Sequence, residues 1–195
     1  MMGKVSKDWS VVKLQRLLDP TDLVELPPWE RGMFKYRSPG DVEISNDEVQ
    51  VQNSLGRYSH PKYKDAHWHI KNVVENVIGE KIYPTYYYER FYFKGGELKR
   101  HFDRPSCEIS VSYNVSSNLD YDWPLYFQGK NSNEPPVAIT CLPGDGVIYR
   151  GEDLWHWREP MKGNHKSYFH QVFFHFVRAN GPYVHFAGDT EQRTA

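Results

Sequence analysis

The chain has 195 residues, of which 39% are hydrophobic and 25% are charged, and its 24 basic and 25 acidic side chains leave a formal net charge of -1. This length predicts one domain, residues 1–195, that is long enough to bury a sizeable core. The balanced charge argues against nucleic acid as a partner, and the absence of an apolar run near the roughly 20 residues that cross a bilayer argues against a membrane. We therefore expect a soluble, cytoplasmic protein.

The amino-acid composition favours a β-sheet protein. Cys107 and Cys141 are too few for a disulfide framework or a four-cysteine zinc site, and they fit a reducing cytosol. Aromatic residues make up 15% of the chain, and such side chains suit pleated, half-buried surfaces. Thirteen prolines and fourteen glycines supply many turns, so an all-helical bundle is not expected.

The first third of the chain predicts two helices with a turn-rich stretch between them. Residues 8–18 have apolar residues at helical spacing up to Asp19-Pro20. Residues 27–59 are polar and rich in turns, apart from short candidate edge strands such as 33–36. Residues 64–78 predict a second helix, with Asp65 as its cap, one apolar stripe and Gly79 as its end.

The rest of the chain predicts strands separated by short turns. The segments expected to be strands are residues 83–93, 98–103, 107–115, 123–127, 137–141, 146–150 and 166–177. This spacing is typical of an antiparallel sandwich or a closed antiparallel sheet, in which a helix covers one face. Residues 40–63 and 128–136 are long polar loops, and the sequence does not decide whether either closes over a site.

One pair of polar residues is placed to bind a metal. In His101-Phe102-Asp103, residues two apart on a strand point to the same face, so an imidazole and a carboxylate would project side by side. Taken alone, this pair is more typical of an exposed polar strand end. A third candidate ligand, His156, lies between two tryptophans downstream, where a stacked aromatic histidine is the alternative interpretation.

Together these three residues favour an iron site. Two imidazoles and one carboxylate that leave coordination positions open indicate non-haem Fe(II) that activates dioxygen, whereas a structural zinc site closes its fourth position. Lys166 begins the last predicted strand, on the face that alternation gives to Val172 and Phe174. A lysine at the start of an apolar face suggests a buried anion such as a dicarboxylate, unless its ammonium group lies in water.

The order of these motifs resembles a known family. The chain has Tyr92, a Gly95-Gly96 turn, His101-x-Asp103, Trp-Pro-Leu-Tyr-Phe at 123–127, Pro-Gly-Asp at 143–145, His156 and then a basic residue about ten positions on. This order resembles the 2-oxoglutarate/Fe(II)-dependent dioxygenases, most of all their prolyl 4-hydroxylase-like branch, which includes small phage and bacterial members. The resemblance covers roughly residues 64–177, which would form the catalytic core, with residues 1–63 as an N-terminal extension and loops.

The resemblance implies a fold and a role for each candidate residue. The core would be a cupin-like double-stranded β-helix (jelly roll), mainly β, with N-terminal helices packed on one sheet. The iron ligands would be His101, Asp103 and His156, and the 2-oxoglutarate contacts would be Tyr92, Asn114 and Lys166. The anchor for the distal carboxylate stays open, because Arg158 ranks second and Lys162 and His165 lie in the same stretch.

The implied activity is hydroxylation by Fe(II), 2-oxoglutarate and O2, with ascorbate as an optional reductant. Prolyl residues in a peptide or protein are the first-choice substrate, and succinate and CO2 would be released. A free amino acid or another small molecule is the alternative substrate. A cupin-like metal-binding or sensor module without turnover is the alternative class, and dependence on 2-oxoglutarate discriminates the two. If a phage encodes the chain, the cytoplasm is that of the host cell.

Overall fold

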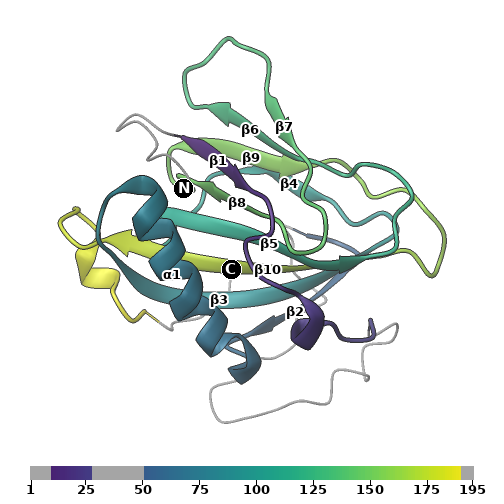
Figure 1. Ribbon diagram of the computed structural model, residues 1–195. Coiled ribbons are helices and arrows are strands. Elements are labelled where there is room, and N and C mark those ends of the chain that lie inside the picture. The colour runs from purple at the N-terminus through teal and green to yellow at the C-terminus, as the bar shows by residue number, and fades with distance from the viewer. Residues whose placement is uncertain (1–9, 28–50, 190–195) are drawn as a thin grey trace.

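The computed structural model describes residues 10–27 and 51–189, and in it two antiparallel sheets face each other (Figure 1). The larger sheet has the strand order β1 (Val11–Leu14), β8 (Gly146–Tyr149), β5 (Ile109–Ser117), β10 (Tyr168–Arg178), β3 (Ile82–Phe93) and β2 (Ser54–Tyr58). The smaller sheet has the order β4 (Leu98–His101), β9 (Leu154–Arg158), β6 (Leu125–Gly129) and β7 (Val137–Ile139). The expectation of a mainly β, antiparallel protein is confirmed.

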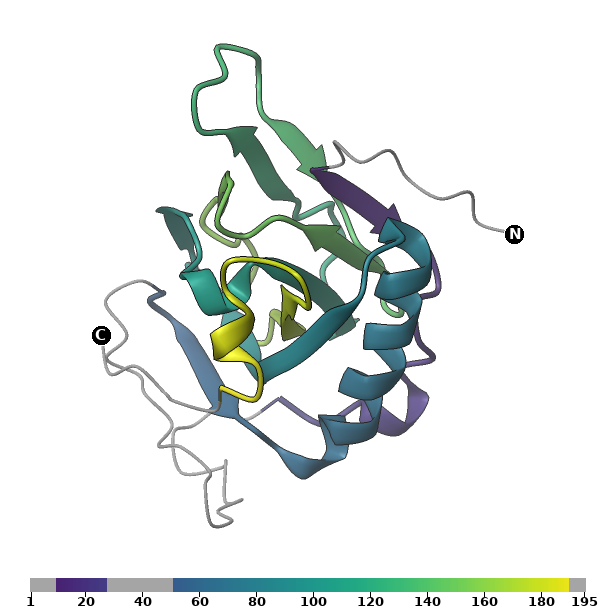
Figure 2. The same cartoon turned by 90° about the vertical axis from the view of Figure 1, so that its left-hand side faces the viewer.

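The helix α1 (Lys64–Ile78) covers the outer face of the larger sheet, as Figures 1 and 2 show. Its buried Ile70 and Val74 pack in one cluster with residues of β5 and β10. The helix ends where predicted, because Gly79 adopts the left-handed conformation at φ 75°. Asp65 is not its cap, since Tyr63 holds the N-cap position and makes no side-chain hydrogen bond there.

The predicted helix over residues 8–18 is wrong. Val11–Leu14 form the edge strand β1, which pairs with β8, and Arg16 then turns the chain at φ 51°. Leu14 and Leu17 are buried, so the apolar spacing reflects burial of a short strand and a turn rather than of a helix. In the described ranges α1 is therefore the one α-helix on the sheet, where the prediction was for two N-terminal helices.

Two further strands were missed. Ser54–Tyr58 form β2 within the stretch predicted to be turns, and Leu154–Arg158 form β9, which carries His156. The candidate edge strand at 33–36 lies outside the described residues. Short 3-10 helices complete the described fold: η1 (Thr21–Leu23), η3 (Pro61–Tyr63), η4 (Pro105–Cys107) and η5 (Val184–Phe186). No helix in residues 10–27 and 51–189 combines the length and apolar character needed to cross a membrane.

The space between the sheets holds a second apolar cluster that includes Tyr92, Trp123, Phe127, Tyr149 and Phe169. Alternation along β10 decides which residues reach it. Phe169 faces this interior, whereas Val172 and Phe174 face α1. The face that the sequence assigned to Lys166 is therefore the one that α1 covers, and the interior side of β10 is formed by the odd-numbered residues.

Candidate metal centre

The pairing of β4 with β9 brings the two predicted histidine ligands together. His101 is the last residue of β4, and its antiparallel partner across the sheet is His156 in the middle of β9. Residues that lie opposite each other on antiparallel strands have their side chains on one face, a few ångströms apart. The two imidazole ring centres are 4.2 Å apart.

Asp103 reaches the same point from beyond the strand. The prediction extended the strand through Asp103, but β4 ends at His101, and the Asp103 backbone N–H donates to the carbonyl of Gly151 at 2.9 Å. The close approach depends on that glycine, because a Cβ atom there would lie 2.2 Å from Asp103 Oδ2. A hydrogen bond to the loop before β9, rather than strand alternation, therefore brings the carboxylate to the histidines.

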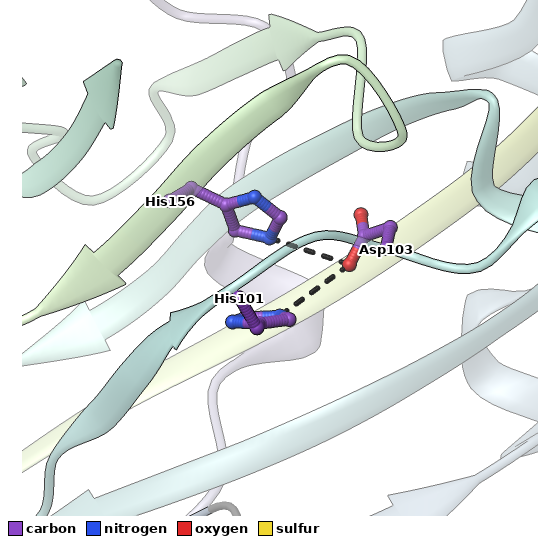
Figure 3. Close-up of side chains that lie close together, drawn as sticks. All are labelled: His101, Asp103 and His156. Atoms are coloured by element: carbon purple, nitrogen blue, oxygen red, sulfur yellow. Dashed lines mark ion pairs between the residues drawn. The ribbon is translucent and has the colours of Figure 1, made fainter. Parts of the chain in front are cut away.

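Figure 3 shows the three side chains converging on one point. Asp103 Oδ1 lies 3.5 Å from His101 Nε2 and 3.3 Å from His156 Nε2. One ligand atom from each of the three residues lies within 4.8 Å of the others. These separations match three donors arranged around a single divalent ion.

A hydrogen bond on the far side of each imidazole ring determines which nitrogen faces the cluster. His101 Nδ1 lies 2.8 Å from the carbonyl oxygen of Lys99, and His156 Nδ1 lies 3.0 Å from that of Leu154. A carbonyl only accepts, so each Nδ1 carries a proton and each Nε2 is the nitrogen that a metal ion can bind. This is how a metal-binding histidine is usually oriented by its second hydrogen bond.

The electrostatics fit a cation at this point. Burial alone would raise the pKa of Asp103, but His156 and hydrogen bonds with both histidines hold it well below its ordinary value. Burial alone would lower the pKa of His156, yet the Asp103 carboxylate raises it. The negative charge of Asp103 therefore attracts a cation, either a proton or a metal ion, to the carboxylate oxygen that faces the two histidines.

Arg158 lies two residues after His156 on the same face of β9 and points between the sheets. Its side chain is 3% exposed, and Nη1 donates to the Trp123 carbonyl at 2.5 Å while Nη2 donates to Gln171 Oε1 at 3.0 Å. The rings of Trp123 and Phe169 lie 4.6 and 4.7 Å from the guanidinium carbon. Among residues 10–27 and 51–189 no carboxylate pairs with it, and burial lowers its pKa. A buried guanidinium without an anion is costly unless a ligand supplies one.

Two further predicted residues line the same interior. Tyr92 on β3 is fully buried, packs edge-on against Trp123, and has a hydroxyl without a hydrogen-bond partner in the described chain. Asn114 on β5 is also buried; its Nδ2 donates to the Cys141 carbonyl at 2.7 Å, and its Oδ1 has no partner among the residues that the structure covers. Both side chains therefore hold polar atoms that a polar ligand could satisfy.

The structure does not bring Lys166 to the site. This lysine is exposed in the turn before β10, where its backbone N–H donates to Asn164 Oδ1 at 2.8 Å, so the expected burial of its ammonium group is wrong. Lys162 and His165, in the same stretch of chain, are exposed as well. Of the basic residues that the sequence offered as anchors, Arg158, which ranked second, is the one that is buried.

Sequence reasoning missed the residues that support the cluster. Ser110, on β5, donates to Asp103 Oδ2 at 3.0 Å and lies 2.9 Å from Nδ1 of His175 on β10. Gly151 and Gln171 were also missed. A signal was present in the alternation of polar residues along β5, where Ser110, Ser112 and Asn114 occupy every second position.

Comparisons with known proteins support the architecture. No family profile matches the sequence, and no curated protein matches it. A prolyl-4-hydroxylase from Pseudomonas putida is similar in structure, with a TM-score of 0.58, 14% identity, and coverage of 87% of this chain and 92% of that one. HygX from Streptomyces hygroscopicus, solved with nickel and 2-oxoglutarate bound, has a TM-score of 0.60, 10% identity, and coverage of 86% and 82%.

A third similar structure is SnoN, a non-heme alpha ketoglutarate dependent epimerase from nogalamycin biosynthesis, with a TM-score of 0.63, 10% identity, and coverage of 87% of this chain and 77% of that one. Sequence identities this low establish the fold and nothing more. The chain has the double-stranded β-helix fold, and the predicted fold class is confirmed in its β architecture.

Proposed function

We propose that this protein is an Fe(II) oxygenase that uses 2-oxoglutarate and O2. The observation that carries the proposal is that His156 of the His-Asp-His cluster and the buried Arg158, which has no carboxylate partner in the described residues, share one face of β9 inside the fold. A divalent ion bound by the Asp103 carboxylate has a net charge of one positive unit, and the guanidinium of Arg158 adds a second positive charge. A dicarboxylate such as 2-oxoglutarate neutralises both, which favours it electrostatically.

The residues present fit the proposed metal and co-substrate. His101, Asp103 and His156 would hold Fe(II), since two imidazoles and one carboxylate are the donor set of oxygen-activating ferrous sites. When bound, the iron supplies one-electron and O2 chemistry that side chains cannot. Arg158 would bind the distal carboxylate, and the hydroxyl of Tyr92 would donate to the same group. Because this interior is buried, these contacts act where water competes little.

Arg158 also favours an enzyme over a metal-binding module without turnover. A protein that only holds a metal needs the three ligands and gains nothing from a buried, unpaired guanidinium nearby. The hydrogen bonds to the Trp123 carbonyl and Gln171 fix the direction of the guanidinium without neutralising its charge. This arrangement is that of a prepared anion site, which supports dependence on a dicarboxylate.

For the substrate, we propose a prolyl residue in a peptide or protein. The proposal is supported by similarity to a prolyl-4-hydroxylase from Pseudomonas putida and to a viral collagen prolyl hydroxylase from Paramecium Bursaria Chlorella virus-1. The same fold serves an epimerase, so the fold does not determine the substrate. Incubating the enzyme with proline-rich peptides and with free proline, and measuring the gain of one oxygen atom by mass spectrometry, separates the two substrate classes.

The co-substrate proposal is tested by anaerobic titration of the metal-free protein with Fe(II) and then with 2-oxoglutarate, while following the weak visible charge-transfer band of the chelate. The wild type is expected to give the band, and Asp103→Ala is expected to lose it. Arg158→Met keeps a side chain between the rings of Trp123 and Phe169 but removes the charge. We expect it to bind Fe(II) normally and 2-oxoglutarate at least about 30-fold more weakly, because a buried charge partner contributes about 2 kcal/mol or more.

Lys166→Met is the matched control, because it removes an exposed lysine that the sequence had ranked as the anchor. We expect its 2-oxoglutarate affinity to equal that of the wild type. The opposite result, with Lys166→Met impaired and Arg158→Met normal, would reject Arg158. A protein that binds Fe(II) tightly without ever giving the band would favour the metal-binding module instead.

A further inference from the structure

We propose that Ser110 and His175 are positioning residues that hold Asp103 so that only one of its carboxylate oxygens faces the metal. The two oxygens have separate surroundings. Oδ1 lies between His101 Nε2 and His156 Nε2, at 3.5 and 3.3 Å. Oδ2 is directed away from them and accepts a hydrogen bond from Ser110 Oγ at 3.0 Å. This inference rests on the proposed function, since it concerns the same metal centre.

Counting protons fixes the direction of the chain of hydrogen bonds. The Ser110 hydroxyl has one proton and four neighbours: Asp103 Oδ2, the Cys107 carbonyl oxygen at 3.2 Å, His175 Nδ1 at 2.9 Å and the Tyr149 hydroxyl. The carboxylate and the carbonyl only accept, so the serine proton points to their side. His175 Nδ1 must then be the donor, and its proton holds the Ser110 oxygen in place for Asp103.

The supporting pair is rigid because both members lie on central strands. Ser110 on β5 and His175 on β10 are direct partners in the sheet register, and their exposed fractions are 0% and 2%. The His175 ring packs against Tyr86 at 4.6 Å between ring centres. A hydrogen-bond chain anchored on two paired, buried strands limits rotation of the carboxylate, which itself lies on a loop.

A competing interpretation of the same residues is a second metal site, because one atom each from Asp103, Cys107 and His175 also lies within 4.8 Å of the others. Three observations argue against it. The Ser110 hydroxyl already bonds to both Asp103 and His175. Cys107 Sγ is in contact with the Tyr86 hydroxyl at 3.1 Å. Burial raises the pKa of Cys107 to about 12, and a metal binds the thiolate, so a metal at this place would have to displace a firmly held proton.

The consequence for the centre is the number of positions left open. A carboxylate that used both oxygens would occupy two coordination positions, whereas one held by Ser110 occupies a single one. With two histidines, one-oxygen binding leaves room for a bidentate co-substrate and for O2. Hydrogen bonds to a ligating carboxylate usually change metal affinity about 10–100-fold, so the effect is measurable without turnover.

The test is the affinity of the full-length, metal-free protein for Co²⁺, measured by calorimetry, together with the visible spectrum of the bound ion, which reports its coordination. We expect Ser110→Ala to lower the affinity about 10–100-fold and to change the spectrum. His175→Phe keeps the aromatic packing but removes the donor, and we expect a loss within the same range. His175→Asn returns an N–H donor near the Nδ1 position and should restore most of the affinity. Ser116→Ala, at a buried hydroxyl farther along β5, is the control and should bind Co²⁺ like the wild type.

The double variant decides whether Ser110 and His175 act as one chain. If they do, the double variant binds Co²⁺ no more weakly than Ser110→Ala alone. Wild-type affinity and spectrum in both Ser110→Ala and His175→Phe, with all proteins folded by circular dichroism, would overturn this inference and leave the proposed function standing. Failure of the wild type itself to bind Co²⁺ would instead overturn the proposed metal centre, and the inference with it.

Discussion

At Gly151 the absence of a side chain allows Asp103 to reach the metal centre. A Cβ atom at this position would lie 2.2 Å from Asp103 Oδ2 and 2.6 Å from the Cys107 carbonyl oxygen, closer than any real contact. We predict that Gly151→Ala displaces the carboxylate, lowers Co²⁺ affinity at least about tenfold and costs about 1–3 kcal/mol of folding stability. Calorimetric titration and urea unfolding measure the two effects.

Gly129→Ala is the matched control for that substitution. Its new Cβ would meet the side chain of Ser132 at 3.4 Å, which is near ordinary contact. We expect metal affinity to be unchanged and stability to move by less than about 0.5 kcal/mol, as for most surface substitutions. Equal Co²⁺ affinity in Gly151→Ala and the wild type would show that Asp103 can move without loss.

The three candidate metal ligands could be predicted from the sequence, whereas the residues that hold them in position could not. His101, Asp103 and His156 carry their chemistry in their side chains, and their order along the chain resembled a known pattern. The expected burial of Lys166 was wrong because this residue lies in the turn before β10. Both faces of β10 are also buried, so alternation along the strand does not show which face lies between the sheets. Ser110 and Gly151 act only through contacts between segments that are distant in sequence.

At the scale of the elements, α1 was predicted to its last residue, because an apolar stripe and a terminal glycine are both local signals. The helix predicted for residues 8–18 was wrong because a strand of four residues followed by a turn can have the same apolar spacing as a helix. His67 lies on the buried side of α1 and is 4% exposed, because its ring packs against Phe174 and Phe176 of β10.

The burial of His67 predicts a pH dependence of stability. Burial lowers its pKa from 6.5 to about 4, although its hydrogen bond to the His175 carbonyl opposes this. As the pH falls from 6.5 to 4, the unfolded chain binds a proton that the folded chain does not. Folding stability should therefore decrease over this range by about 3 kcal/mol from this group alone.

His67→Gln isolates that contribution, because glutamine keeps an N–H donor for the His175 carbonyl but does not titrate. We predict that the difference in unfolding free energy between wild type and variant shifts by about 3 kcal/mol in favour of the variant between about pH 7 and pH 4. Urea unfolding at both pH values measures it. A difference that stays constant with pH would mean that His67 accepts its proton in the folded protein as easily as in the unfolded chain.

At the scale of the whole molecule, one buried carboxylate joins segments from both ends of the described chain. Glu89 on β3 is fully buried, and its Oε2 accepts from the Tyr63 hydroxyl at 2.5 Å and from His170 Nε2 at 2.7 Å. Its Oε1 pairs with Arg57 of β2, which in turn reaches Glu25 at 2.8 Å. Burial would raise the pKa of Glu89, but His170 and the nearby cations lower it to about 2.

We predict that Glu89→Gln destabilises the fold by about 3–5 kcal/mol, because it leaves the buried Arg57 without its main counter-charge. Glu80→Gln is the matched control: Glu80 is 38% exposed and bonds to Arg178 Nε at 2.8 Å, so its loss should cost less than about 1 kcal/mol. Urea unfolding at neutral pH compares the two variants. Equal costs would indicate that β2 and the N-terminal segment are held to the sheet by apolar packing alone. A large cost confined to Glu89→Gln would show that the ionised carboxylate of Glu89 holds β2, β3, β10 and η3 together. This junction lies on the outer face of the sheet whose inner face supports the metal centre.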